Sequence, residues 1–199
     1  MNPVYPAMLA FAERSWRGGG QPRWIANISD GDVKGFKEFE QRLLNHQQQT
    51  FNSTDASGIK YSFPYQPQSS LEWKFYGPFE KDADAKENFF NANTRAKYFF
   101  KTVTGGTVVL RHWWAPLIKG DIDSIKPNQV WYAITQIWSE ENTIKPFWVG
   151  FNNLSRSPAT DSPPAFAWNE HHASVTVNGG IVPPPIWNRA GQKGNSEIP

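Results

Sequence analysis

The stretch Tyr5-Pro-Ala-Met-Leu-Ala-Phe-Ala-Glu-Arg-Ser-Trp-Arg-Gly-Gly-Gly20 determines how the chain begins to fold. Pro6 suits a first helical turn, because its missing N–H would have no helical partner there. Gly18 to Gly20 supply a residue that can turn left-handed and end the helix. We therefore predict one short helix, whose apolar residues follow helical spacing on one face: Tyr5, Met8, Leu9, Ala12 and Trp16.

This apolar face needs a partner, because a single short helix cannot bury it. Two surfaces could cover this apolar face. The helix packs on the domain that follows, or its partner belongs to a longer protein of which this chain is the tail.

A second helix is predicted at residues 32–48. Phe36, Phe39 or Glu40, Leu43 and Leu44 follow helical spacing there, with charged residues between them. The turn-rich run at 52–58 then changes the composition. We therefore place a boundary at about residue 52, with helices in 1–51 and a second domain in 52–199.

The second domain is predicted to be rich in strands. Gly105-Gly106 fits a tight hairpin turn between two of them. In the run 130–138, Val130, Tyr132, Ile134 and Gln136 share one face. Both faces carry apolar groups, as in an inner strand of a two-layer structure. Many short strands between polar turns indicate an antiparallel β-sandwich. The segments concerned are 59–63, 71–76, 96–103, 107–114, 130–138, 144–151 and 174–179.

Composition excludes several classes of protein. The 199 residues carry a net charge of +2 and no long basic run, so nothing indicates a nucleic-acid partner. No cysteine is present, which excludes disulfides and thiolate metal sites and is compatible with export from a bacterium. No apolar run reaches membrane-spanning length. Met1 is not followed by a signal peptide, so an export signal of a longer parent would lie upstream.

Ten tryptophans are the most informative feature of the composition. Tryptophan rings stack on the C–H faces of sugars, but they also fill β-sandwich cores. Arg111, Trp113 and Trp114 could hold a sugar by stacking and hydrogen bonds. The alternative is a strand end whose tryptophans pack in the core.

The segment Ala12-Glu-Arg-Ser-Trp16 resembles the last barrel helix of glycoside hydrolase family 20, the β-N-acetylhexosaminidases. The downstream chain is similar to the C-terminal region of the large hexosaminidases of Bacteroides-like bacteria. Four segments carry that similarity, in the same order along the chain: 39–46, 110–114, 151–157 and 177–187.

The resemblance implies an α+β fragment. Residues 1–51 hold the last helices of a (β/α)8 barrel and a linking helix, and residues 52–199 form a jelly-roll β-sandwich of the galactose-binding type that is incomplete at its C-terminal end. The implied parent hydrolyses terminal N-acetylhexosamines from glycans and needs no cofactor. Glu13, Arg14 and Trp16 match the family motif and are given a structural role. The alternative to bracing the barrel is an exposed helical charge pair.

The catalytic carboxylates of that family are absent from this sequence. Members use an adjacent Asp-Glu pair, in which Glu is the general acid and Asp orients the acetamido group of the substrate. No Asp-Glu pair occurs here, so no catalytic residue is assigned and the segment alone is predicted to be inactive. Two other hypotheses stay open: a free-standing carbohydrate-binding module and a structural spacer that fixes the last helices of the barrel.

Two acidic or histidine-containing runs are interpreted as solvated turns. Glu140-Glu141 lies between predicted strands. In Glu170-His171-His172, adjacent histidines on a strand would point to opposite faces, which argues against a shared metal ion. No metal ligand is therefore assigned.

Overall fold

The computed structural model describes residues 4–18, 35–51, 65, 67–81, 85–110, 120–122, 125–142, 144, 147, 149–151 and 162–192. They form a mixed α+β structure with a small antiparallel sheet and few helices. The chain divides into two compact units, residues 1–138 and residues 139–199, and each is described by itself. The boundary expected at about residue 52 lies outside the described residues.

The first predicted helix is confirmed as α1, Val4–Arg17. Gly18 ends it in the left-handed conformation, with φ +68°, and its N–H donates to the Arg14 carbonyl at 3.0 Å. The second is α2, Phe36–Phe51. The buried face of α2 carries Glu40, Leu43 and Gln47, two of which are polar.

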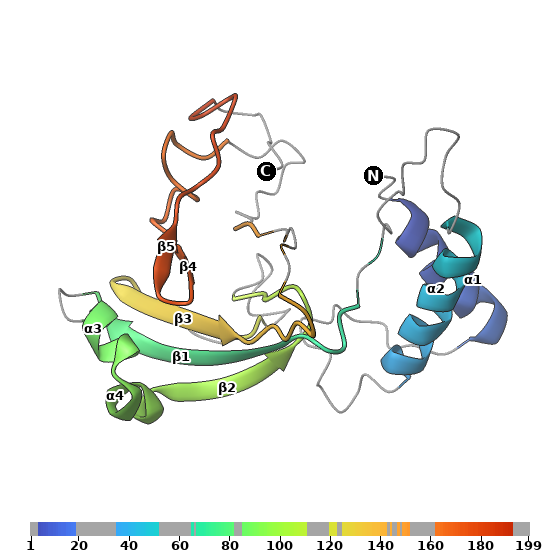
Figure 1. Cartoon of the computed structure of the whole chain (residues 1–199), viewed down its shortest axis with the longest axis horizontal. Coiled ribbons are helices and arrows are strands. Elements are labelled where there is room, and N and C mark those ends of the chain that lie inside the picture. Colours follow the sequence, from blue (N-terminus) through green and yellow to red (C-terminus); the bar gives the residue numbers. More distant parts are fainter. Residues whose placement is uncertain are drawn as a thin grey trace. The chain divides into compact units, whose positions relative to one another are not determined.

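The three-stranded sheet has the order β2-β1-β3, with both pairs antiparallel (Figure 1). Its strands are β1 (Glu72–Glu80), β2 (Phe99–Thr104) and β3 (Gln129–Thr135). Trp73 on the central strand lies opposite Val103 on β2 and Thr135 on β3. The strand expected to be internal, β3, lies at an edge of this sheet, and β1 occupies the centre.

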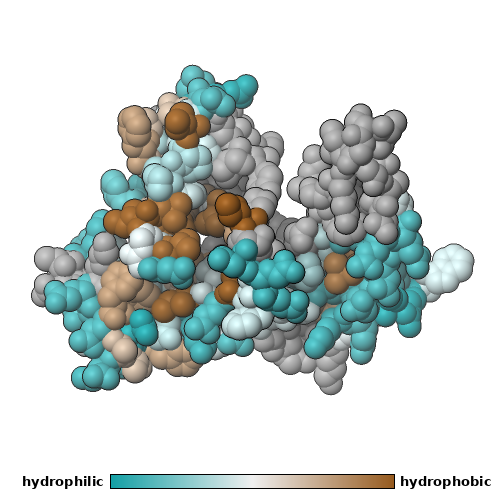
Figure 2. Space-filling model, viewed as in Figure 1, coloured by the Kyte–Doolittle hydropathy of each residue, from teal (hydrophilic) through white to brown (hydrophobic). Residues whose placement is uncertain are grey.

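An aromatic cluster forms the core on one face of this sheet. Phe79 from β1 meets Phe89 from α3 (Ala85–Phe90) edge to face, with ring centroids 6.2 Å apart. Phe89 also stacks on Tyr132 at 3.9 Å. The predicted common face of Val130, Tyr132 and Ile134 is confirmed, because all three pack against this cluster. On the visible side in Figure 2, hydrophobic residues gather over the strands, whereas hydrophilic residues cover most of α1 and α2.

Part of the predicted strand 96–103 is helical. Residues Ala92–Lys97 form α4, and the strand begins only at Phe99. The local cause is Asn91, whose side-chain oxygen accepts the N–H groups of Asn93 and Thr94 and so caps the helix.

The prediction of a hairpin turn at Gly105-Gly106 is wrong. Strand β2 pairs with β1, and the Gly105 N–H donates to the Leu71 carbonyl instead of closing a turn. Residues 107–110 are not in a strand. They are fixed by Asp121, which accepts the Val109 N–H at 3.1 Å and pairs with Lys101 at 3.0 Å.

Among the described residues of the second unit, β4 (Val175–Val177) and β5 (Gly180–Val182) form a hairpin. This confirms the strand and turn predicted at 174–179. Trp168 is buried and donates its indole N–H to the Val182 carbonyl at 3.2 Å. The described residues of the predicted strand 144–151 are not in a strand, which corrects that prediction.

Candidate functional site

The predicted sugar-binding residues Arg111, Trp113 and Trp114 lie outside the described residues. The motif residues Glu13, Arg14 and Trp16 lie on α1. Arg14 and Trp16 are exposed, Trp16 with 92% of its surface accessible, and Glu13 is half-buried.

Glu13 links the two helices. Its carboxylate accepts a hydrogen bond from Nε of Arg42 on α2 at 3.2 Å. It also accepts a hydrogen bond from Nη2 of the same guanidinium. Arg17, one turn further along α1, lies 3.6 Å from the same carboxylate. A two-point arginine–carboxylate contact fixes orientation as well as distance, so Glu13 sets how α1 lies on α2.

A groove of about 360 Å³ runs along this contact. Apolar side chains of both helices contribute most of its surface, and its polar members are Glu13, the two arginines that pair with it and His46. The residues that line it are Leu9, Ala12, Glu13, Trp16, Arg17, Phe39, Arg42, Leu43 and His46.

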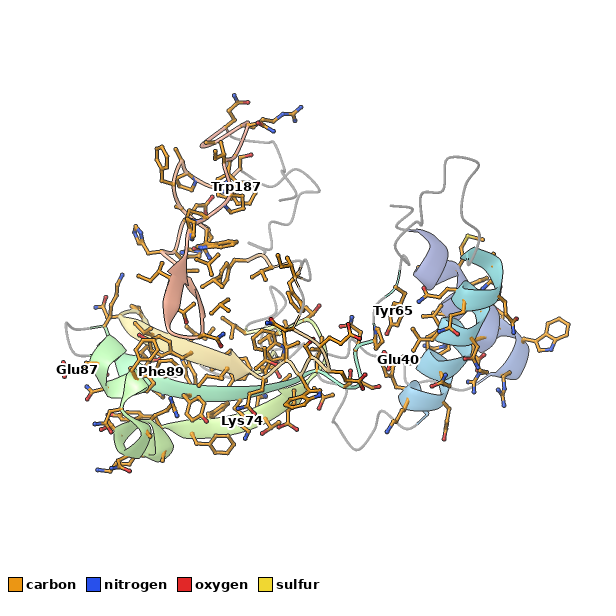
Figure 3. All side chains as sticks on the ribbon, in the orientation of Figure 1. Glu40, Tyr65, Lys74, Glu87, Phe89 and Trp187 are labelled. Atoms are coloured by element: carbon orange, nitrogen blue, oxygen red, sulfur yellow. The ribbon has the colours of Figure 1, made fainter. Side chains whose placement is uncertain are left out.

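A buried polar contact joins α2 to the chain that leads into the sheet. The Glu40 carboxylate, 3% exposed, accepts hydrogen bonds from the Tyr65 hydroxyl at 2.7 Å and from the Gln68 N–H at 2.5 Å. It also accepts the Ser69 N–H at 3.2 Å and the Ser69 hydroxyl. Figure 3 shows Glu40 and Tyr65 close together beside α2.

Gln47 extends this contact by two turns of the same helix. Its Nε2 donates to the Tyr65 carbonyl at 2.9 Å, and its Oε1 accepts the Tyr65 N–H at 3.3 Å. The Gln47 amide thus satisfies both backbone groups of one residue. We call Glu40 and Gln47, together with the residues they bind (Tyr65, Gln68 and Ser69), the α2 clamp.

The electrostatics of the clamp favour a charged carboxylate. Burial alone would raise the pKa of Glu40, but the hydrogen bonds from Ser69, Tyr65 and Gln68 outweigh it and lower the pKa below its ordinary value. Burial and the Glu40 carboxylate together raise the pKa of Tyr65. Glu40 therefore stays ionised and Tyr65 neutral at ordinary pH.

This arrangement suits anchoring better than chemistry. A general acid needs a raised pKa and access to substrate, whereas Glu40 is buried, ionised and already accepts several hydrogen bonds. The clamp is not among the sites predicted from the sequence. The sequence feature that points to the clamp is the placement of Glu40 and Gln47, seven residues apart, among the apolar positions of a helix.

Three tryptophans in the strand-rich part are held by their indole N–H groups. Trp73 donates to the Gly105 carbonyl at 3.0 Å and Trp187 to the Ala167 carbonyl at 2.8 Å, in addition to the Trp168 bond described above. Such bonds place a ring as a packing element. Trp138, by contrast, is exposed.

The remaining candidates are exposed side chains. Glu140 and Glu141 lie in solvent, as expected, and so do His171 and His172. Within the described residues, no group of three or more potential ligands could hold a metal ion. The helices among those residues also include none long and apolar enough to cross a membrane.

The chain matches no protein-family model, no curated protein and no solved structure. A function for it therefore depends on the residues and contacts described above.

Proposed function

We propose that this chain is the C-terminal part of a β-N-acetylhexosaminidase of glycoside hydrolase family 20. In this proposal the strand-rich region is a jelly-roll accessory domain without catalytic residues. Its role is to support the end of a (β/α)8 barrel, namely the last barrel helix, α1, and the linking helix, α2. The parent enzyme would remove terminal N-acetylglucosamine or N-acetylgalactosamine from glycans with retention of configuration.

The α2 clamp is the observation that carries the supporting role. Glu40 and Gln47 bind the residues immediately before β1, so that α2 and the entrance to the sheet are joined by buried hydrogen bonds. Glu13 and Arg42 then join α1 to α2. A continuous series of contacts therefore connects the sheet to the helix with the hexosaminidase-like motif.

The surface of α1 also favours a larger parent. Phe11 lies on the side of α1 away from the groove residues Leu9 and Ala12 and is 76% exposed. A helix with apolar side chains on both sides is typical of a helix covered on both sides. In the proposed parent, the rest of the barrel would supply that cover.

Catalysis is assigned to the parent and not to this segment. The family mechanism needs an Asp-Glu pair at a barrel strand end, and this sequence contains no such pair. We expect the purified chain to release no nitrophenol from p-nitrophenyl N-acetyl-β-glucosaminide. Release by the chain alone would contradict the proposal.

The decisive experiment begins with the reading frame that surrounds the gene. We expect an in-frame barrel with an adjacent Asp-Glu pair upstream, and the longer product should hydrolyse the same nitrophenyl substrate. An upstream sequence without such a barrel would reject the assignment.

The supporting role is tested in that longer enzyme. Glu40→Ala should lower its Tm while kcat/KM measured well below that Tm stays unchanged, because the clamp holds a scaffold and does not touch substrate. Glu38→Ala, an exposed position of the same helix, is the matched control. A loss of kcat/KM at full folding in Glu40→Ala would contradict a purely supporting role.

The competing function is a non-catalytic carbohydrate-binding module. It requires exposed aromatic rings on one face. Trp73, Trp168 and Trp187 donate their N–H groups to backbone carbonyls, which counts against it, whereas Trp138 is exposed. Calorimetric titration of the chain with N-acetylglucosamine and N-acetylgalactosamine distinguishes the two. The supporting role predicts no binding heat, and saturable binding would favour the module.

A further inference from the structure

The tip of the β4–β5 hairpin is the sole Asn-Gly sequence in the chain, Asn178-Gly179. Val177 pairs with Gly180, so these two residues form the entire loop. Both have positive φ, 50° and 84°, as a type I′ turn requires. We propose that Asn178 is a site of spontaneous covalent modification, at which the asparagine is converted to isoaspartate and aspartate.

Access to the reacting atoms supports this site. Asn178 and Gly179 are both exposed, and a Cβ placed on Gly179 would meet nothing within 4 Å. The attacking atom is the backbone nitrogen of Gly179, which belongs to the loop and not to a paired ladder residue. Glycine carries no side chain that would hinder this nitrogen, so the loop can rotate toward the reactive geometry without breaking a strand pair.

The chemistry needs only water and a base. The deprotonated nitrogen of Gly179 forms a bond to the side-chain Cγ of Asn178, and the Cγ–N bond breaks with release of ammonia. Water then opens the resulting succinimide at either carbonyl. The net reaction is asparagine plus water to aspartate or isoaspartate plus ammonia, and no atom is oxidised or reduced.

The modification has a structural consequence within the second unit. Isoaspartate carries an additional methylene in the main chain and a negative charge, and a two-residue type I′ loop has no room for a longer backbone. The pairing of Val175 with Val182 then loses its register. Since the Val182 carbonyl accepts the Trp168 N–H, the change also removes the hydrogen bond of a buried tryptophan.

Asn128 provides a control within the same chain. It is exposed, lies in a turn and has φ 59°, very close to the conformation of Asn178. The residue that follows it is Gln129, which carries a side chain, begins β3 and pairs with Glu80. The two asparagines share an exposed turn conformation but differ in the residue that would attack and in whether that residue is paired in a strand.

The test is incubation of the full chain at mildly alkaline pH, followed by peptide mapping with mass spectrometry and isoaspartate detection. We expect position 178 to convert first, with isoaspartate in excess of aspartate, at a rate that rises with pH. Asn128 should stay intact over the same period. The aged protein should also show a lower Tm than fresh protein.

Two variants and one comparison keep the proposal falsifiable. Asn178→Gly retains residues suited to a type I′ turn, and it should accumulate no isoaspartate in this peptide and keep its Tm on incubation. Conversion of Asn178 in urea but not in the native chain would overturn the proposal, because the folded turn would then protect the site. Equal conversion at Asn128 and Asn178 would overturn it as well.

Discussion

Helices α1 and α2 have similar lengths, 14 and 16 residues, but they are held in very different ways. Helix α2 buries a leucine and two polar side chains. Glu40 accepts hydrogen bonds from three residues, and Gln47 binds both backbone groups of Tyr65. Helix α1 contacts α2 along an open groove and leaves Met8, Phe11 and Trp16 largely exposed.

The difference shows what fixes a helix in this chain. For α2, burial of Glu40 without partners would be costly, so its many hydrogen bonds specify one position for the helix. For α1, the cross-helix ion pair gives direction but little free energy, because its members are partly exposed. Helix α1 therefore has unused apolar surface, and α2 has none of comparable size among its described residues.

Glu40→Ala should have the largest effect on the free energy of unfolding. The substitution leaves the Tyr65 hydroxyl and the N–H groups of Gln68 and Ser69 without an acceptor. Since each unsatisfied buried group costs about 1–3 kcal/mol, we expect a loss of about 3 kcal/mol. Urea unfolding followed by circular dichroism measures it.

The control for this variant is Glu38→Ala on the exposed side of α2. It should cost less than about 1 kcal/mol, since it removes only a favourable charge near the helix N-terminus. Equal losses in the two variants would show that charge on α2, and not the clamp, holds the helix.

The stabilisation that Glu40 provides should depend on pH. The pKa of Glu40 is lower in the folded protein than its ordinary value. Its contribution is therefore fully present above the unfolded pKa of about 4.3 and is lost as the pH falls through the lower folded value. The difference in free energy of unfolding between wild type and Glu40→Gln should shrink over that acidic range. A difference that grows on acidification would contradict the clamp geometry.

Sequence patterns predicted the helices better than the sheet connections. The apolar spacing of α1 and its glycine stop were sufficient to locate that helix, and the alternation at 130–135 identified the core face of β3. The short helix α4 was missed because Asn91 as a cap outweighed the strand-like composition that follows it. The prediction of a hairpin at Gly105-Gly106 is wrong because β2 pairs with β1, which lies well before it in the sequence.

Periodicity places Glu40 and Gln47 on one face of a helix but does not show that they bind residues 65–69. A glutamate among apolar helix positions normally indicates the solvent edge of a face, and only the chain before β1 reveals its partners. For this reason the sequence leaves open whether Phe39 or Glu40 belongs to the apolar face of this helix. The predicted sugar-binding residues at 111–114 lie outside the described residues, so that prediction stays open.

The Glu13–Arg42 contact should contribute a smaller effect than the clamp. A double-mutant cycle with Glu13→Gln and Arg42→Gln should give a coupling free energy of about 0.2–1 kcal/mol, as for partly exposed ion pairs. The coupling should weaken in high salt, since exposed charges are screened. A coupling unaffected by salt would argue against a mainly electrostatic contact.

Phe11→Ser should have the smallest effect in this chain and the most informative one in a longer parent. Because Phe11 is largely exposed, the free energy of unfolding of the present chain should change by no more than about 0.5 kcal/mol. If the rest of a barrel covers α1, the same substitution there removes a buried aromatic ring and should cost at least about 1.5–3 kcal/mol. Ala10→Ser, on the same helix, is the control and should cost little in either protein. Equal, small losses from Phe11→Ser in both proteins would show that this face of α1 stays uncovered, and the main structural reason to regard α1 as part of a larger barrel would be lost.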